Sequence, residues 1–158
     1  MTLFCYLTSL SAILAGSDTM GAVMEALILV LAMNPHVQTR AQMELDKVVG
    51  SPTSSVFRLP SFLDRPSMPY MEALTKELMR WHPSAAYGFP HATMEEDVYR
   101  GWRIPKGTIV FANGWGMLRD EKYYKDPYIF RPERFIPEKE KQAEPDPELH
   151  GVFGFGRR

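Results

Sequence analysis

The chain has 158 residues, of which 45% are apolar or aromatic, and its formal net charge is −1. This length suffices for one moderate hydrophobic core and not for two ordinary domains, so we expect a single domain over residues 1–158. The apolar content and the balanced charge argue against a disordered polyelectrolyte and against a nucleic-acid-binding protein. The single cysteine, Cys5, excludes an internal disulfide.

Residues 3–33 are predicted to form one long helix, because the stretch is apolar nearly all round, lacks the alternation of a strand and is too long for one. Residues 1–17 carry no charge, and only Asp18 and Glu25 interrupt the apolar run. A membrane span is the alternative, although a carboxylate near the middle of a span costs roughly 3 kcal/mol. We therefore expect a buried helix of a soluble protein, in which Cys5 packs as a small hydrophobic side chain.

An amphipathic helix should follow directly. Asn34 is expected to cap it, with Pro35 in its first turn, and Gly50 supplies its end. Its apolar positions recur at intervals of four, four and three: Val37, Ala41, Leu45 and Val48. Such spacing indicates a helix that packs on one side. Residues 51–66, rich in serine, threonine and proline, are then predicted to be a loop.

A third helix is predicted to begin near Pro69. It should end at His82, because the residue before a proline, here Pro83, is disfavoured in helical geometry. Its expected buried stripe consists of Met71, Leu74, Leu78 and Trp81.

The pattern changes to short strand-like runs between Tyr87 and Asn113. The runs Trp102-Arg103-Ile104 and Thr108-Ile109-Val110-Phe111 flank a Pro105-Lys106-Gly107 turn. This arrangement predicts a hairpin within a small sheet.

Beyond Trp115 the prolines, at positions 127, 132, 137, 145 and 147, preclude long regular elements, so we expect a coil that side chains hold in place. Glu77 and Arg80 lie three residues apart on the third helix and can pair. Arg134 of the coil offers a second cation to the same carboxylate. A buried Glu-Arg-Arg network would pin the coil to the helix through charge-assisted, fork-shaped hydrogen bonds.

The segment Ala15-Gly16-Ser17-Asp18-Thr19 is the first candidate for a catalytic motif. Glycine inside a helix costs about 1 kcal/mol relative to alanine, so Gly16 suggests that another group, such as a flat cofactor, approaches the helix there. Thr19 could donate a hydrogen bond to a reacting oxygen, and Asp18 could relay protons from water. On these residues alone the alternative is favoured, in which Thr19 bonds to a carbonyl of its own helix and Asp18 pairs with a surface cation.

The last residues, Phe153-Gly154-Phe155-Gly156-Arg157-Arg158, form a glycine-spaced, doubly basic loop. Taken alone, two terminal arginines indicate a solvated end. His91 could likewise be a solvated loop histidine. The four histidines, at positions 36, 82, 91 and 150, have no paired metal-ligand spacing, so we expect no zinc or non-haem iron site.

In this order and with these separations, the motifs resemble the carboxy-terminal half of the haem-thiolate monooxygenases, the cytochrome P450 family. The family's oxygen-activating helix carries Ala/Gly-Gly-x-Asp/Glu-Thr-Thr/Ser, which Ala15 to Thr19 match, whereas Met20 replaces the second hydroxyl. The family's haem-ligand loop is Phe-x-x-Gly-x-Arg-x-Cys. Phe153, Gly156 and Arg158 match its first six positions, and the sequence ends before the cysteine.

This resemblance implies a mainly α fold with a small β-sheet, helical over 1–83, with the sheet and a proline-rich meander over 84–158. It implies haem b (iron protoporphyrin IX) and a monooxygenase that inserts one atom of dioxygen into a small, apolar organic substrate with electrons from a reductase. The implied catalytic residues are Asp18 and Thr19. The implied cofactor-binding residues are Ala15, Gly16, His91, Phe153, Gly156 and Arg158, with no metal ligand in the chain.

Two further expectations follow from the resemblance. Without the thiolate the chain as given should be inactive, and a eukaryotic member would reside at the endoplasmic reticulum membrane through an anchor absent here. The alternative function is a non-catalytic truncated relic, or a fragment that binds a partner or a membrane through its apolar helix.

Overall fold

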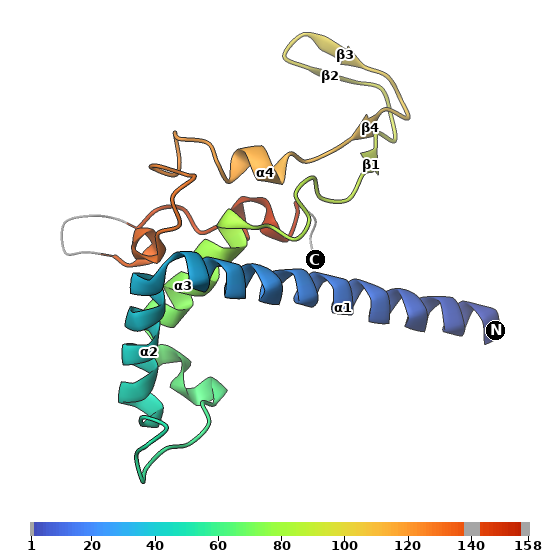
Figure 1. The fold of residues 1–158 in the computed structure, drawn as a ribbon. Coiled ribbons are helices and arrows are strands. Elements are labelled where there is room, and N and C mark those ends of the chain that lie inside the picture. Colours follow the sequence, from blue (N-terminus) through green and yellow to red (C-terminus); the bar gives the residue numbers. More distant parts are fainter. Residues whose placement is uncertain (1, 138–142, 156–158) are drawn as a thin grey trace.

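The fold, seen in a computed structural model that describes residues 2–137 and 143–155, is mainly helical with short antiparallel strands, as predicted (Figure 1). The helices are α1 (Thr2–Met33), α2 (Pro35–Val49), α3 (Pro69–Trp81) and α4 (Gly114–Met117), with the helical turns η1 (Phe62–Ser67), η2 (Pro132–Phe135) and η3 (Glu148–Val152). The strands are β1 (His91–Ala92), β2 (Asp97–Tyr99), β3 (Trp102–Ile104) and β4 (Ile109–Val110).

The core lies where the carboxy-terminal end of α1 meets α2 and α3. Its buried residues are Ala26, Val30, Val37, Ala41, Tyr70, Leu74, Leu78 and Phe130. The predicted apolar faces of α2 and α3 therefore point inward, with Leu45, Val48, Met71 and Trp81 half-buried at the rim. Phe130 of the coil covers Trp81 edge-to-face, with ring centroids 6.1 Å apart.

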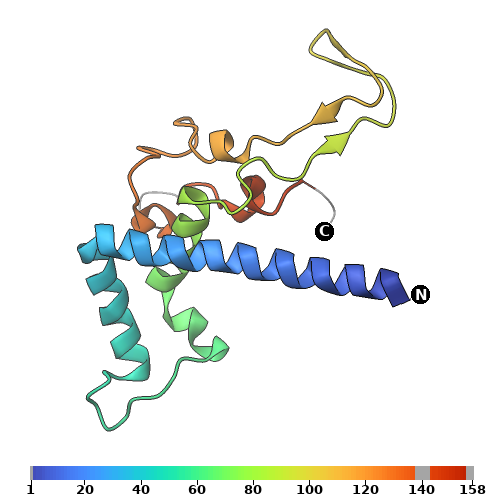
Figure 2. The same ribbon diagram turned by 45° about the vertical axis from the view of Figure 1, so that its right-hand side comes forward.

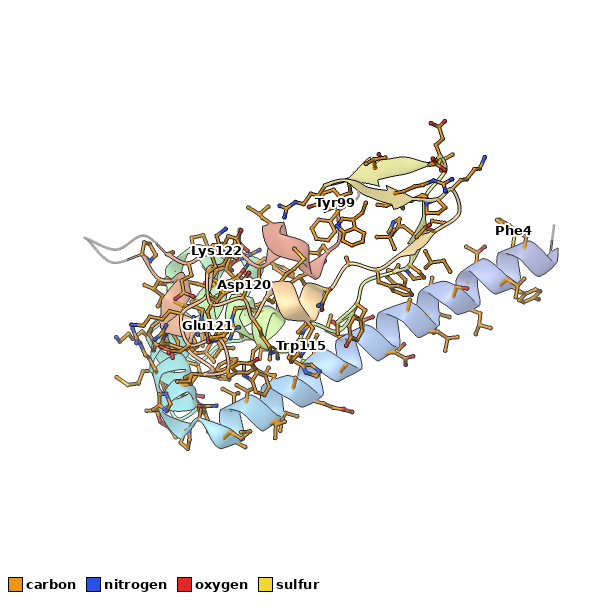
Figure 3. All side chains as sticks on the ribbon, turned by 90° about the horizontal axis from the view of Figure 1, so that it is seen from above. Phe4, Tyr99, Trp115, Asp120, Glu121 and Lys122 are labelled. Atoms are coloured by element: carbon orange, nitrogen blue, oxygen red, sulfur yellow. The ribbon has the colours of Figure 1, made fainter. Side chains whose placement is uncertain are left out.

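α1 is one unbroken helix, but it is not buried over most of its length. Residues 4–20 are all exposed, and both Figure 1 and Figure 2 show this half of the helix extending beyond the other elements. The prediction of a buried helix is wrong here, because a helix that is apolar all round needs cover on every side and the described elements cover only its other end. Cys5 is accordingly exposed rather than packed. Figure 3 shows Phe4 at the free end of α1.

The same helix has the length and hydropathy of a membrane span from Phe4 to Met33. It shares this property with core helices of soluble proteins.

The helix ends differ from the prediction in one place. Asn34 does not cap α2: its Nδ2 donates to the carbonyl of Val30 at 2.9 Å and so closes α1 instead. α2 starts with Pro35, which has no N–H to satisfy. At the end of the loop predicted for residues 51–66, residues 62–67 form η1, which begins with a reciprocal capping box between Ser61 and Asp64.

The strands pair differently from the predicted hairpin. β3 pairs with β2, with Tyr99 opposite Trp102, whereas β4 pairs with β1. The turn is Arg100-Gly101, with φ of 49° and 83°, because two successive residues at positive φ match the twist of paired strands. Pro105-Lys106-Gly107 forms a corner between β3 and β4 instead. Figure 3 shows Tyr99 on the hairpin that projects from the rest of the molecule.

Replacing Gly101 by alanine should weaken the hairpin by about 1 kcal/mol, because an added Cβ has open space but the φ of +83° strains an L residue. The measurement is hydrogen exchange at the β2–β3 amides, which should accelerate about fivefold. Gly21→Ala is the control: this glycine also has open space but lies in α1, so the substitution should stabilise the helix. Slower exchange in the hairpin of Gly101→Ala would contradict the turn assignment.

Candidate functional site

The predicted Glu-Arg-Arg network forms, and it is completely buried. Arg80 donates from Nε to Glu77 Oε2 at 2.7 Å and from Nη2 to Oε1 at 2.9 Å, within α3. Arg134, from η2, places its Nε 3.0 Å from Glu77 Oε2, as an ion pair without hydrogen-bond alignment. All three side chains have zero exposure, so the prediction that the coil is pinned to the helix is confirmed.

Backbone groups complete the network. The N–H of Arg131 donates to Glu77 Oε1 at 2.8 Å, and Arg80 Nη1 donates to the carbonyl of Leu118 at 2.8 Å. Arg134 donates to the carbonyl oxygens of Lys125, Asp126 and Ile129 at 2.8, 3.3 and 3.1 Å. These backbone groups belong to the coil between α4 and η2, which has no regular backbone hydrogen bonds of its own. The guanidinium groups of Arg80 and Arg134 therefore hold this coil in place.

Tyr124 lies against the network, with its ring 5.4 Å below the Arg80 guanidinium. The side chain is buried, and within the described residues its hydroxyl has no hydrogen-bond partner. Burial raises the pKa of Tyr124 to about 12, because the phenolate would lose its hydration.

The predicted motif on α1 lies on the exposed part of that helix. Ala15, Gly16, Asp18 and Thr19 are all exposed, and a Cβ added to Gly16 would meet nothing within 4 Å. Thr19 Oγ1 donates to the carbonyl of Ala15 at 2.5 Å, which is the local bond weighed as the alternative. Among residues 2–137 and 143–155, no cation lies within ion-pair distance of Asp18.

His91 and Phe153 come from segments that meet at Gly114. A Cβ on Gly114 would lie 3.3 Å from the carbonyl oxygen of Ala86, which is a tight contact, and 3.7 Å from that of Gly151, so the loop before β1 and η3 both pack closely against this glycine. His91 is exposed on β1, with Nδ1 2.9 Å from the carbonyl of Phe89. Phe153 is exposed directly after η3.

The structure thus assembles the Glu-Arg-Arg network, and it places Ala86 of the loop before β1 and Gly151 of η3 against the same residue, Gly114. No hydrogen bond or ion pair in the described part of the chain joins the α1 motif to His91 or Phe153. Gly156 and Arg158 lie outside the described residues. The catalytic and cofactor-binding roles of the individual residues therefore stay predictions.

The surfaces near these residues suit a flat, apolar group that carries carboxylates. Aromatic side chains next to β1, β4 and η3 are uncovered: Tyr87, Phe89, Phe111, Phe153 and Phe155. Gly16 leaves one side of α1 open to a planar ring. His91, when protonated, keeps its Nε2–H available for a carboxylate while Nδ1 is bonded to Phe89. The residues present thus fit a haem, and the described residues contain no group of histidine, cysteine or carboxylate side chains that could hold a metal ion.

Comparison with known proteins settles the family. The family model described as Cytochrome P450 matches residues 7–158. The chain belongs to the cytochrome P450 family.

Among the relatives of this P450 chain is "Cytochrome P450 monooxygenase COX1" of Coprinopsis cinerea, 45% identical over 96% of the chain and 28% of that protein. "O-methylsterigmatocystin oxidoreductase" of Aspergillus flavus is 40% identical over 96% of the chain and 28% of that protein. "Cytochrome P450 monooxygenase ple1" of Rhodocybe pseudopiperita is 46% identical over 92% and 27%. The chain spans little more than a quarter of the length of these relatives.

Two site residues were not predicted from the sequence. Glu144 binds Arg134 and Arg131, and Gly114 packs closely against both the loop before β1 and η3. Glu144 lies in a proline-rich coil without periodicity, so no local pattern indicates its partners. Gly114 follows Asn113 at the start of a helical turn, where glycine has a second, local explanation.

Glu77→Gln should lower the free energy of unfolding by about 3–5 kcal/mol, because Arg80 and Arg134 would stay buried without the carboxylate between them. Urea unfolding measures this loss. The matched control is Glu72→Gln on the same helix, where the pair with Arg65 is surface-exposed and worth less than about 1 kcal/mol. Equal losses in the two variants would show that the network does not hold the fold.

Alkaline titration tests the burial of Tyr124. Its pKa is raised from 10.0 to about 12 in the folded chain, so its contribution to stability is complete below pH 10 and is lost as pH rises toward 12. Because burial also raises the pKa of Tyr70 to about 12, Tyr124→Phe should reduce the total alkaline fall in stability by about 2 kcal/mol and not remove it, at little cost at pH 7. Tyr128→Phe, at an exposed position, should leave the fall unchanged. If Tyr124→Phe lost as much stability between pH 10 and pH 12 as the wild type, Tyr124 would not be the group whose burial raises this pKa.

Proposed function

We propose that the full-length protein containing these residues is a haem-dependent monooxygenase that inserts one atom of dioxygen into a small, apolar organic substrate and takes electrons from a reductase. The observation that carries this proposal is the family match over residues 7–158, together with a complete Glu-Arg-Arg network. The relatives named as monooxygenases support it. We further propose haem b as the cofactor.

In this proposal, residues from both halves of the chain hold the haem. Ala15 and Gly16 of α1 would face one side of the ring, because no side chain fills the space beside Gly16. Phe153 and Gly156 would also contact the haem, and Arg158 and His91 would bind its propionates.

The bound haem would supply the site at which dioxygen is reduced. Asp18 and Thr19 would deliver the protons that this reduction consumes, with Asp18 in contact with water on the exposed face of α1. The Thr19 hydroxyl has one proton, which it now donates to the carbonyl of Ala15. It must therefore rotate away from that carbonyl before it can donate to a reacting oxygen.

The proposal assigns no thiolate ligand to residues 1–158. Cys5 is the one cysteine, and it lies ten positions before Ala15, a distance of about 15 Å along α1. Cys5 would thus lie beyond the ring that Gly16 faces.

A second candidate function is non-catalytic binding of a partner or a membrane through α1. The specific observation in its favour is the exposure of residues 4–20, which include Phe4, Leu10 and Ile13. The two candidates differ in one measurable property, since only the first requires haem.

The reduced, carbon-monoxide-bound absorption spectrum tests the haem proposal. The full-length protein should show the band of a thiolate-ligated haem, whereas residues 1–158 mixed with haem should show none, because Cys5 is misplaced for ligation. Absence of haem from the full-length protein would favour the second candidate, and a thiolate band from residues 1–158 would contradict the ligand assignment.

Asp18→Asn tests the proton pathway in the same full-length protein. Loss of the acid should lower the reductase-supported rate of dioxygen consumption about 10²-fold, with haem content unchanged, because proton delivery becomes limiting. Glu25→Gln is the matched control, since Glu25 is the other acid of α1 and lies two turns away. A comparable loss in both variants would point to a general effect of charge on the helix.

A further inference from the structure

The buried network needs a second negative charge. Arg80 and Arg134 are both completely buried, and Glu77 supplies one carboxylate for the two guanidinium groups. Glu144, only 13% exposed, supplies the other: its Oε2 accepts from Arg134 Nη1 at 2.5 Å and its Oε1 from Arg131 Nη2 at 3.4 Å. Because an uncompensated buried cation is costly, Glu144 makes the interior of the network neutral.

Glu144 also fixes the register of the chain. Its backbone N–H donates to the carbonyl of Arg134 at 2.9 Å, so Arg134 holds both the side chain and the backbone of the same residue. A shift of the coil by one residue would break both contacts at once.

A second attachment lies two residues further on. Asp146 Oδ2 accepts a hydrogen bond from Lys76 of α3 at 2.6 Å, and Asp146 Oδ1 accepts from the N–H of Glu148 at 3.0 Å, where η3 begins. Pro145 and Pro147 flank Asp146 and restrict φ on either side, and Pro147 is fully buried. The chain is therefore tied to η2 and then to α3 before η3 starts.

The position of the last segment follows from these attachments. η3 runs directly from Pro147 and places the carbonyl of Gly151 in van der Waals contact with Gly114, 3.7 Å from the position of a Cβ on that glycine. Phe153 follows two residues later. The segment for which we propose haem binding is thus aligned from Glu144 at one end and from α4 at the other.

We propose that Glu144 is a positioning residue for the haem-side loop: its charge neutralises Arg134, and its backbone bond sets the register of residues 144–155. It acts through Arg134 and touches no cofactor. This inference rests on the proposed function for its effect on haem, whereas its effect on the register can be measured without haem.

The first experiment compares Glu144→Gln with Glu148→Gln by hydrogen exchange in the haem-free chain of residues 1–158. Glu148 is exposed and lies in the same segment. In Glu144→Gln, the amides of Leu149, Val152 and Gly154 should exchange about tenfold faster or more, while α2 amides keep their wild-type rates. Glu148→Gln should match the wild type. Unchanged exchange, or acceleration spread equally over α2, would overturn the proposal.

The second experiment uses the haem-loaded full-length protein and the reduced carbon-monoxide spectrum. Glu144→Gln should convert about half or more of the thiolate-type band to the band of a haem without thiolate, and Glu144→Asp should restore part of it. If Glu144→Gln unfolds, Asp146→Asn supplies the same readout from the more exposed attachment. A full thiolate band in Glu144→Gln would overturn the positioning role. A wild-type protein without any thiolate band would overturn the proposed function, and the exchange experiment would then decide the inference by itself.

Discussion

The carboxylate of Glu77, buried between two guanidinium groups, is the interaction on which the rest of the structure depends. Arg80 binds it from one turn along α3, and Arg134 reaches it from a segment more than fifty residues away. A buried charge that loses its partner costs several kcal/mol, so α3 and η2 are stable only together. The core formed by α1, α2 and α3 is apolar, and it therefore offers an unpaired charge no alternative partner.

The proline-rich coil depends on the same constraint for a second reason. Backbone carbonyls in a coil have no ladder partners, and buried ones must find donors elsewhere. Arg134 provides several donors in a fixed planar fork, and three carbonyls of the coil use them. One side chain thus replaces regular secondary structure, and Glu144 balances its charge. The proposed haem-side loop inherits its position from this arrangement.

α1 presents the opposite situation. Its last turns belong to the core through Ala26 and Val30, whereas residues 4–20 are exposed. Under the proposed function, the haem and further parts of a protein of the relatives' length cover this surface. The Thr19 hydroxyl, in this exposed part, donates to the carbonyl of Ala15 one turn earlier in the same helix.

The sequence by itself determined the bounds of α2 and α3, because proline and glycine act on the backbone locally, and its motifs were enough to predict the family and the Glu77–Arg134 contact. Only the tertiary structure decided how the strands pair, since the positive φ of Arg100 carries no residue-type signal. It likewise decided the exposure of α1 and the partner of Glu144, because both depend on which distant elements come into contact. Local backbone preferences depend on neighbouring residues in the sequence, whereas burial and charge pairing depend on the contacts of the assembled fold.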